Sequence, residues 1–127
     1  MIADPMMRKR SFLVLACAAL LTTACHQDSF TLRSDEAVVI RYNSSEGEVV
    51  HTALALVERD IEAVFSVHPT LSTDNNEADI VVGTMGQSAL IEPLGIDLSP
   101  LEGKKEAFLV TVTPDKQLII VGSDPQG

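Results

Sequence analysis

Apolar positions recur every three or four residues from Val50 to Phe65, which is the spacing of one face of an α-helix. The stripe consists of Val50, Ala53, Leu54, Val57, Ile61, Val64 and Phe65. Ser45 and Glu48 have the spacing of a capping box, so this pair predicts where the helix begins. The helix should end at His68-Pro69, because proline cannot continue the helical hydrogen bonds and pushes the preceding residue out of the helical region.

Runs of β-branched and aliphatic residues on both sides of this helix predict strands. Val38–Tyr42 precedes it, and Asp79–Gly83 follows with the continuous apolar character of a strand that is covered on both faces. We therefore expect Asp79–Gly83 to be central in a sheet. Glu106–Thr113 and Gln117–Gly122 are separated by Pro114-Asp115-Lys116, a loop of hairpin length, so they should form an antiparallel pair.

The segments between these strands read as loop and short helix. The polar run Leu71–Ala78 predicts a loop, and Gln87–Glu92 predicts a short helix that Pro93 and Gly95 stop. The order is then β-α-β-α-β-β. It predicts an α/β fold, with α+β as the other possibility, in which a small mixed sheet carries one long helix on a face.

The first 25 residues have the pattern of a bacterial lipoprotein signal. Arg8-Lys9-Arg10 is followed by an apolar run from Phe12 to Leu21, and Thr22-Thr23-Ala24-Cys25 resembles a lipobox. Residues 1–24 are the predicted signal peptide, residues 25–36 a linker after a lipidated Cys25, and residues 37–127 one α/β domain. A lipid anchor on Cys25 would attach the exported protein to a membrane of the cell envelope, in the periplasm or outer membrane of a Gram-negative bacterium.

The charge balance limits the partners. The 127 residues include 9 Lys and Arg and 18 Asp and Glu, which gives a formal net charge of −9. A protein that binds phosphates needs a positive face, so we expect no nucleic-acid partner. Of the two cysteines, Cys17 lies inside the signal peptide, which leaves Cys25 without a partner for an intramolecular disulfide.

No constellation of catalytic residues stands out after Cys25. Glu58, Asp60 and Glu62 form the densest acidic cluster, and a solvated helix face explains them. The three histidines are too scattered for a zinc site, which needs three or four convergent donors, so no metal or other cofactor is expected. They are His26, His51 and His68.

Two glycine-containing turns follow predicted strands. Gly83-Thr84-Met85-Gly86 is interpreted as a turn with a helix cap, with anion binding by its backbone amides as the minor alternative. Gly122, Ser123 and Asp124 stand at the carboxyl end of the last strand, where α/β sheets bind ligands. They are a possible ligand-proximal loop, and the alternative is a plain turn at a domain junction.

Five segments together resemble the N-terminal region of glycoside hydrolase family 115, the xylan α-1,2-glucuronidases. They are Val38-Val39-Ile40, Leu56–Ile61, Ile80–Thr84, Leu101–Phe108 and Leu118–Asp124. The resemblance runs from about Glu36 to Gly127, and its most specific pieces are Gly83-Thr84, Leu101-Glu102-Gly103-Lys104 and Gly122-Ser123-Asp124. The family usually has a basic residue before the glycine that follows the last motif, where this chain has Gln126.

This resemblance implies an accessory domain similar to those that precede the catalytic barrels of hexosaminidases and other α-glucuronidases. The catalytic carboxylates would then lie downstream in the barrel of the same polypeptide, and the full enzyme would remove (4-O-methyl)glucuronic acid side chains from xylan. No catalytic residue is carried over to this chain. The domain itself would buttress the barrel.

Two functions are left open. In the first, the chain is the N-terminal fragment of this exported glycosidase, and one face of its sheet is thinly covered because a downstream element is missing. The isolated chain should then be marginally stable or aggregate. In the second, the chain is a complete small envelope lipoprotein whose α/β domain binds a carbohydrate or a protein.

Overall fold

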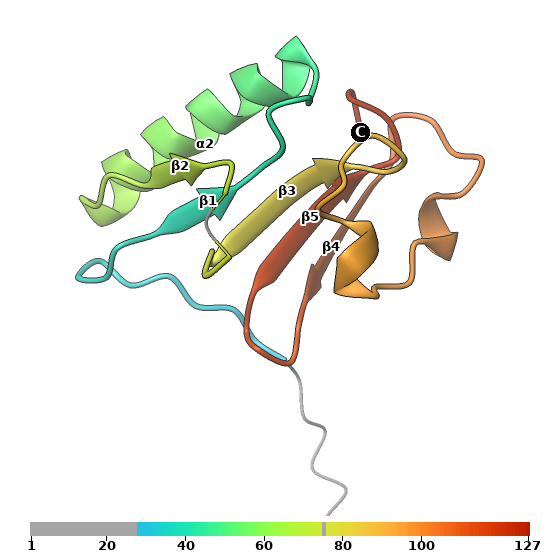
Figure 1. Cartoon of the computed structure of the whole chain (residues 1–127). Coiled ribbons are helices and arrows are strands. Elements are labelled where there is room, and N and C mark those ends of the chain that lie inside the picture. Colours follow the sequence, from blue (N-terminus) through green and yellow to red (C-terminus); the bar gives the residue numbers. More distant parts are fainter. Residues whose placement is uncertain (1–27, 75) are drawn as a thin grey trace, which may run out of the picture.

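The computed structural model describes residues 28–74 and 76–127, and within these ranges the chain forms a five-stranded sheet with one long helix (Figure 1). The predicted signal peptide and Cys25 lie outside the described residues. The regular elements are β1 (Val39–Arg41), α2 (Glu48–Phe65), β2 (Thr70–Ser72), β3 (Ile80–Thr84), the 3-10 turns η1 (Glu92–Leu94) and η2 (Ser99–Leu101), β4 (Phe108–Val112) and β5 (Leu118–Gly122).

The strand order is β2-β1-β3-β5-β4. The first four strands of this order run parallel, and β4 is antiparallel to β5. Helix α2 makes the crossover from β1 to β2 that a parallel pair requires. The predicted α/β class with a mixed sheet, the central place of β3 and the β4–β5 hairpin are therefore confirmed.

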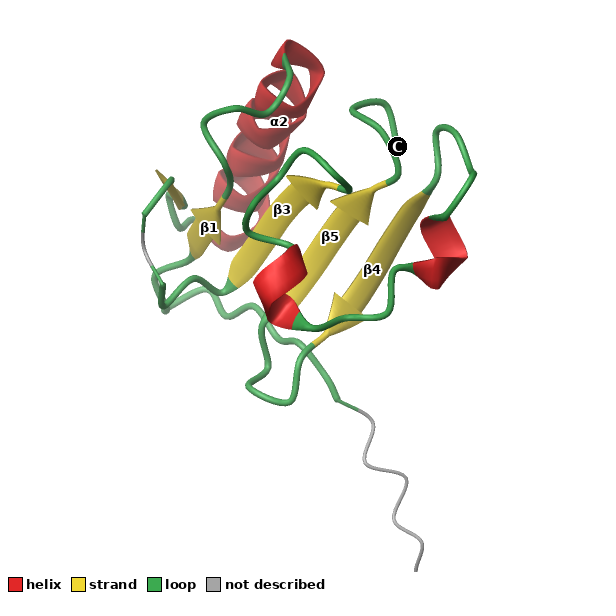
Figure 2. Ribbon diagram, turned by 45° about the vertical axis from the view of Figure 1, so that its right-hand side comes forward, coloured by secondary structure: helices red, strands yellow, loops and turns green. Residues whose placement is uncertain are grey.

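Alternate residues along the strands point to two separate apolar cores, one on each face. Val81, Ile119 and Val121 face the long connection between β3 and β4, which contains η1 and η2 and contributes Ile91 and Leu101. Figure 2 shows η1 in front of the sheet, η2 beside β4 and α2 behind the sheet. The second core, on the α2 side, contains Val38, Ile40, Leu54, Ile61 and Ile80.

The start of α2 differs from the prediction. Gly47 is the N-cap residue and makes no side-chain cap, so the proposed capping box of Ser45 and Glu48 is wrong. The backbone amide and hydroxyl of Ser45 instead donate to Asn43 Oδ1 at 3.0 and 2.8 Å, which closes a local Asx turn. The helix ends at Phe65 because Ser66 adopts a left-handed conformation with φ 56°, before His68-Pro69 is reached.

Two predictions about the connections are also wrong. The predicted loop Leu71–Ala78 begins inside β2, a three-residue edge strand that pairs with β1 and carries no apolar run of its own. The predicted helix over Gln87–Glu92 does not form. Only the short turn η1 is present there, with Pro93 in its first turn, and Gly95 ends it with φ 64°. Residues 28–36 have no regular element, yet Phe30 and Leu32 pack against the α2-side core.

Candidate functional site

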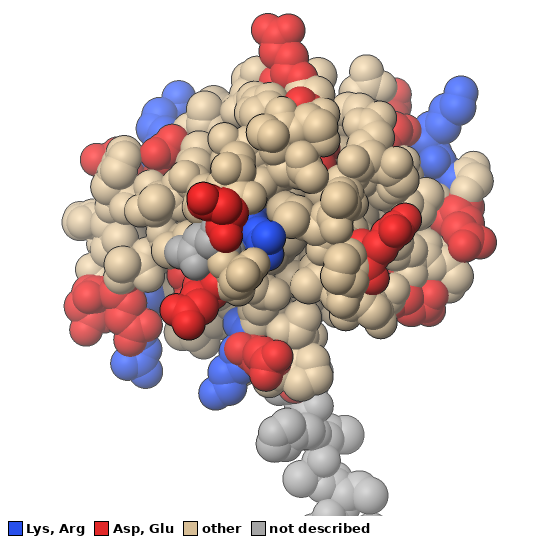
Figure 3. Space-filling model, in the orientation of Figure 1, with Lys and Arg blue, Asp and Glu red and all other residues tan. Residues whose placement is uncertain are grey.

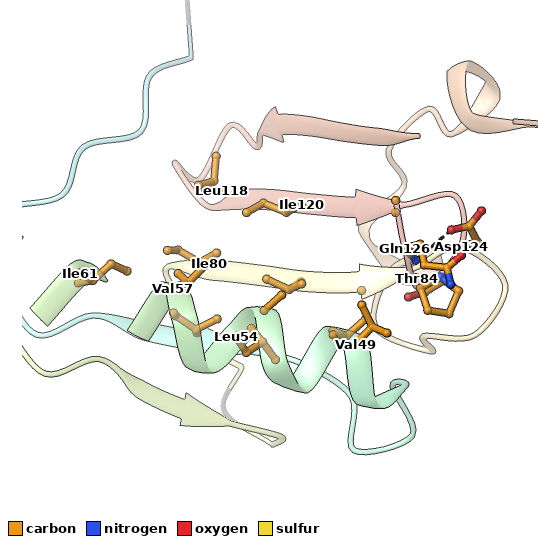
Figure 4. Close-up of a pocket in the computed structure, with 18 of the residues that line it drawn as sticks. Val49, Leu54, Val57, Ile61, Ile80, Thr84, Leu118, Ile120, Asp124 and Gln126 are labelled. Atoms are coloured by element: carbon orange, nitrogen blue, oxygen red, sulfur yellow. Dashed lines mark hydrogen bonds between the residues drawn. The ribbon is translucent and has the colours of Figure 1, made fainter. Parts of the chain in front are cut away.

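An apolar groove lies on the α2 side of the sheet, between α2 and β5 (Figure 4). Its volume is about 450 Å³. Val49 and Val57 of α2 form one wall, and Leu118 and Ile120 of β5 form the floor. The carboxyl ends of β3 and β5 close one end of the groove, where Thr84, Gly122 and residues 124–127 line it.

The groove exists because the apolar stripe of α2 is wider than the surface it covers. Only Leu54 and Ile61 of the helix are buried against the sheet. Val49 and Val57 stay 51% and 41% exposed. The sheet continues past the helix to β4, where Phe108 is 68% exposed. The apolar surface is therefore continuous from the flank of α2 across β5.

A buried carboxylate fixes the closed end of this groove. Glu46, in the turn before α2, is 5% exposed, and Thr84 at the end of β3 is 2% exposed. Glu46 Oε1 accepts from the Thr84 amide at 3.1 Å, and Oε2 accepts from the Thr84 hydroxyl at 2.7 Å. Glu46 is not among the candidate residues predicted from the sequence. The only signal for it was an acidic residue in a strand-to-helix turn.

This pair decides between the two interpretations of Gly83-Thr84-Met85-Gly86. The Thr84 amide, which an anion would need, already donates to the protein's own carboxylate. The segment is a turn, in which the Thr84 carbonyl accepts from the amides of Gln87 and Ser88. Gly83 has no side chain because a Cβ would lie 2.7 Å from Ile91 Cγ1 and 2.8 Å from Ser88 Cβ.

Gly122, Ser123 and Asp124 lie together at the carboxyl end of β5, and their hydrogen bonds go to the chain's own backbone. Ser123 Oγ accepts from the Ala107 amide at 3.1 Å. Asp124 accepts from the amides of Glu106 at 2.8 Å and Gln126 at 2.9 Å. These backbone donors, Glu106 first, hold the pKa of Asp124 below its ordinary value. That this loop approaches a ligand stays a prediction.

The remaining polar candidates are on the surface. His68 lies between Glu58 and Glu62, with ring nitrogens 3.2 Å from a carboxylate oxygen of each. Asp60 contacts Arg59 at 3.4 Å, with both side chains about 70% exposed. Such exposed pairs contribute little to stability. The face shown in Figure 3 carries dispersed basic side chains among acidic ones, without a basic patch.

Neither a metal site nor a membrane span emerges from the described ranges. Over residues 28–74 and 76–127, no group of three or more His, Cys, Asp or Glu side chains converges closely enough to hold a metal ion. In the same ranges, no helix has both the length and the apolar character needed to cross a bilayer.

Comparison with known proteins relates the chain to a solved glycosidase. No family model matches the chain, and no curated protein matches it. Among solved structures, the chain is similar to BtGH115A, a family GH115 4-O-methyl-α-glucuronidase with specificity for decorated arabinogalactans. The two are 45% identical with a TM-score of 0.70, over 78% of this chain and 13% of that chain.

The mixed sheet with its open apolar groove thus defines a small α/β domain of the kind found within a larger glycosidase. The resemblance to a fragment of glycoside hydrolase family 115, inferred from its motifs, is confirmed by this match. The chain spans about one eighth of the length of the GH115 enzyme that it matches.

Proposed function

We propose that this chain is the N-terminal, non-catalytic domain of an exported GH115 glycosidase that removes (4-O-methyl)glucuronic acid branches from a polysaccharide. The 45% identity to a 4-O-methyl-α-glucuronidase is the observation that carries the proposal. The domain would support the catalytic barrel by packing against it, because it has an extensive apolar groove and few candidate catalytic side chains.

The carboxylates of this domain support a non-catalytic role. Retaining and inverting glycosidases need two carboxyl groups about 5 to 9.5 Å apart that face the same bond. At the end of the groove, Glu46 is occupied by Thr84. Asp124 accepts two backbone amides there. Glu58 and Glu62 flank His68 on an exposed helix surface. None of these carboxylates faces an open sugar site.

Xylan is the substrate that the family resemblance implies, whereas the similar enzyme of known structure is specific for decorated arabinogalactans. The uronic acid branch is the feature that these substrates share. We therefore propose a glucuronic acid-decorated polysaccharide as the substrate class, with glucuronoxylan as the first member to test.

The test compares the 127-residue chain with the full-length polypeptide encoded at its locus. Each is incubated with glucuronoxylan and with glucuronic acid-decorated arabinogalactan, and released uronic acid is measured by chromatography. We expect release by the full-length protein only. Release by the 127-residue chain would contradict the non-catalytic role, and no release from either substrate by the full-length protein would contradict the proposed activity.

A further inference from the structure

Strand β4 forms one edge of the sheet, and its outer backbone groups are unpaired. The Ser123 amide donates to the Ala107 carbonyl at 2.7 Å, and the Thr113 amide donates to the Gln117 carbonyl at 2.9 Å. Bonded and non-bonded pairs alternate along an antiparallel ladder, so every second residue of β4 points its amide and carbonyl away from β5. These residues are Phe108, Val110 and Val112. No hydrogen bond joins their outer groups to another part of residues 28–74 or 76–127.

The side chains of β4 also leave this edge open to another strand. Edge strands are usually protected by a charge, a proline, a bulge or a covering element. β4 has the sequence Phe-Leu-Val-Thr-Val, which contains neither a charge nor a proline. Phe108 and Val110 are 68% and 50% exposed. The turn η2 lies beside β4 (Figure 2), but its Leu101 packs into the core on the face opposite α2, whereas Val110 pairs with Ile120 on the α2 side.

We propose that β4 pairs with β4 of a second copy of this chain in antiparallel orientation, which joins the two sheets into one. The proposal goes beyond the function proposed above and does not depend on it. With the two-fold axis at Val110, all five residues of both strands pair. Val110 then lies opposite Val110, and Phe108 lies opposite Val112 of the second copy. Aromatic and β-branched side chains that face each other in this way stabilise an antiparallel pair.

The symmetry of this pairing favours a second copy as the partner. The two edges of the sheet are β2 and β4. β2 has only three residues, and its pairing with β4 of another copy would be a head-to-tail contact that continues into a ring or a filament. Pairing of β4 with itself uses the same surface on both copies and closes after two.

The charges that flank β4 match in the same arrangement. Lys105 precedes the strand and Asp115 follows it, and both are exposed. They are equally far from Val110 along the chain, so the two-fold axis brings Lys105 of one copy to the same end as Asp115 of the other. Opposite charges at the rim of an interface favour this register over a parallel one, which would bring like charges together. The interface is small, so we expect a reversible dimer that depends on protein concentration.

The test measures the association of the full-length polypeptide encoded at the locus, expressed from His26 onward so that no lipid anchor contributes. Sedimentation velocity gives the fraction of dimer over a concentration series. Val110→Lys and Val110→Glu each place like charges opposite each other at the two-fold axis, which destabilises a strand pair. Val64→Lys is the matched control, because Val64 is 73% exposed on α2 and lies outside the proposed contact.

We expect the parent protein and Val64→Lys to dimerise with the same Kd, and each Val110 variant to raise the Kd by about tenfold or more. An equimolar mixture of the two Val110 variants should dimerise again, because a lysine then faces a glutamate. Circular dichroism checks that the variants keep the secondary structure of the parent protein.

Hydrogen exchange of the unaltered protein is a second measurement that needs no variant. The amides of Phe108, Val110 and Val112 should exchange about tenfold more slowly at high than at low protein concentration. The Leu71 amide is the control. It lies on the outer edge of β2, because the Thr70 amide and the Ser72 carbonyl bond to residues beside β2 on the β1 side, and its exchange should not change.

Four results would overturn the inference. They are a protein that stays monomeric at every concentration, a dimer whose Kd is unchanged by Val110→Lys, a mixture of the two Val110 variants that does not associate, and concentration-dependent protection at Leu71 in place of β4. The last result would identify head-to-tail assembly through β2.

Discussion

Replacing Glu46 by alanine should destabilise the domain more than any other exchange of an acidic residue in the described structure. The carboxylate accepts the amide of Thr84 at 3.1 Å and its hydroxyl at 2.7 Å, with both residues at least 95% buried. Glu46→Ala leaves both donors without a partner. A buried unpaired donor costs about 1–3 kcal/mol, so we expect a loss of about 3 kcal/mol in the free energy of unfolding.

The assay is urea denaturation of the domain, after the parent protein has been shown to unfold reversibly, with the slope checked for constancy between variants. Glu46→Gln keeps one acceptor oxygen and should lose about 1 kcal/mol. Glu102→Ala, on an exposed turn, is the control and should stay within about 0.5 kcal/mol of the parent chain. If Glu46→Ala lowers the free energy of unfolding by no more than the Glu102→Ala control does, the prediction is refuted. The amide and hydroxyl of Thr84 would then be satisfied without the carboxylate.

Three further outcomes are expected. Gly83→Ala should lower stability by about 2 kcal/mol in the same assay, because its Cβ would overlap Ile91 at 2.7 Å; an unchanged midpoint would contradict the packing. The lowered pKa of Asp124 means that its stabilisation is present above its ordinary value of 3.8 and is lost as pH falls through the lower value in the folded state. Asp124→Asn should therefore reduce the loss of thermal stability between pH 6 and pH 3, and a parallel pH profile would argue against it. If Cys25 is lipidated as proposed, Cys25→Ser should move the protein from the detergent to the aqueous phase in a partition experiment, and no change would contradict lipidation.

The sequence predicted the elements whose signal is local and long. The apolar period of α2 extends over most of its 18 residues, and β3 and the β4–β5 hairpin carry apolar runs bounded by turn residues. β2 could not be found in this way, because its three residues become a strand only through pairing with β1. The capping box was wrong for a similar reason: the amide and hydroxyl of Ser45 donate to Asn43 Oδ1 and not to the helix.

The candidate site was predictable only in part. Thinly covered apolar surface was expected from a single helix on the sheet, and the groove beside Val57 and Ile120 agrees with that expectation. The hydrogen bond between Thr84 and Glu46 joins residues that are 38 positions apart, and no local sequence pattern predicts it. The same holds for the link between Asp124 and Glu106, which depends on the hairpin register.

The strand order has a consequence for how the polypeptide acquires this fold. β5 is the last strand in sequence but lies between β3 and β4 in the sheet. As the chain emerges from the ribosome, β3 and β4 thus have no strand to bridge them until residues 118–122 appear. Contacts between distant residues slow folding, and unpaired strand edges promote aggregation. The sheet therefore cannot be completed before the last of its five strands is synthesised, and a chaperone that holds the nascent chain until then would raise its yield.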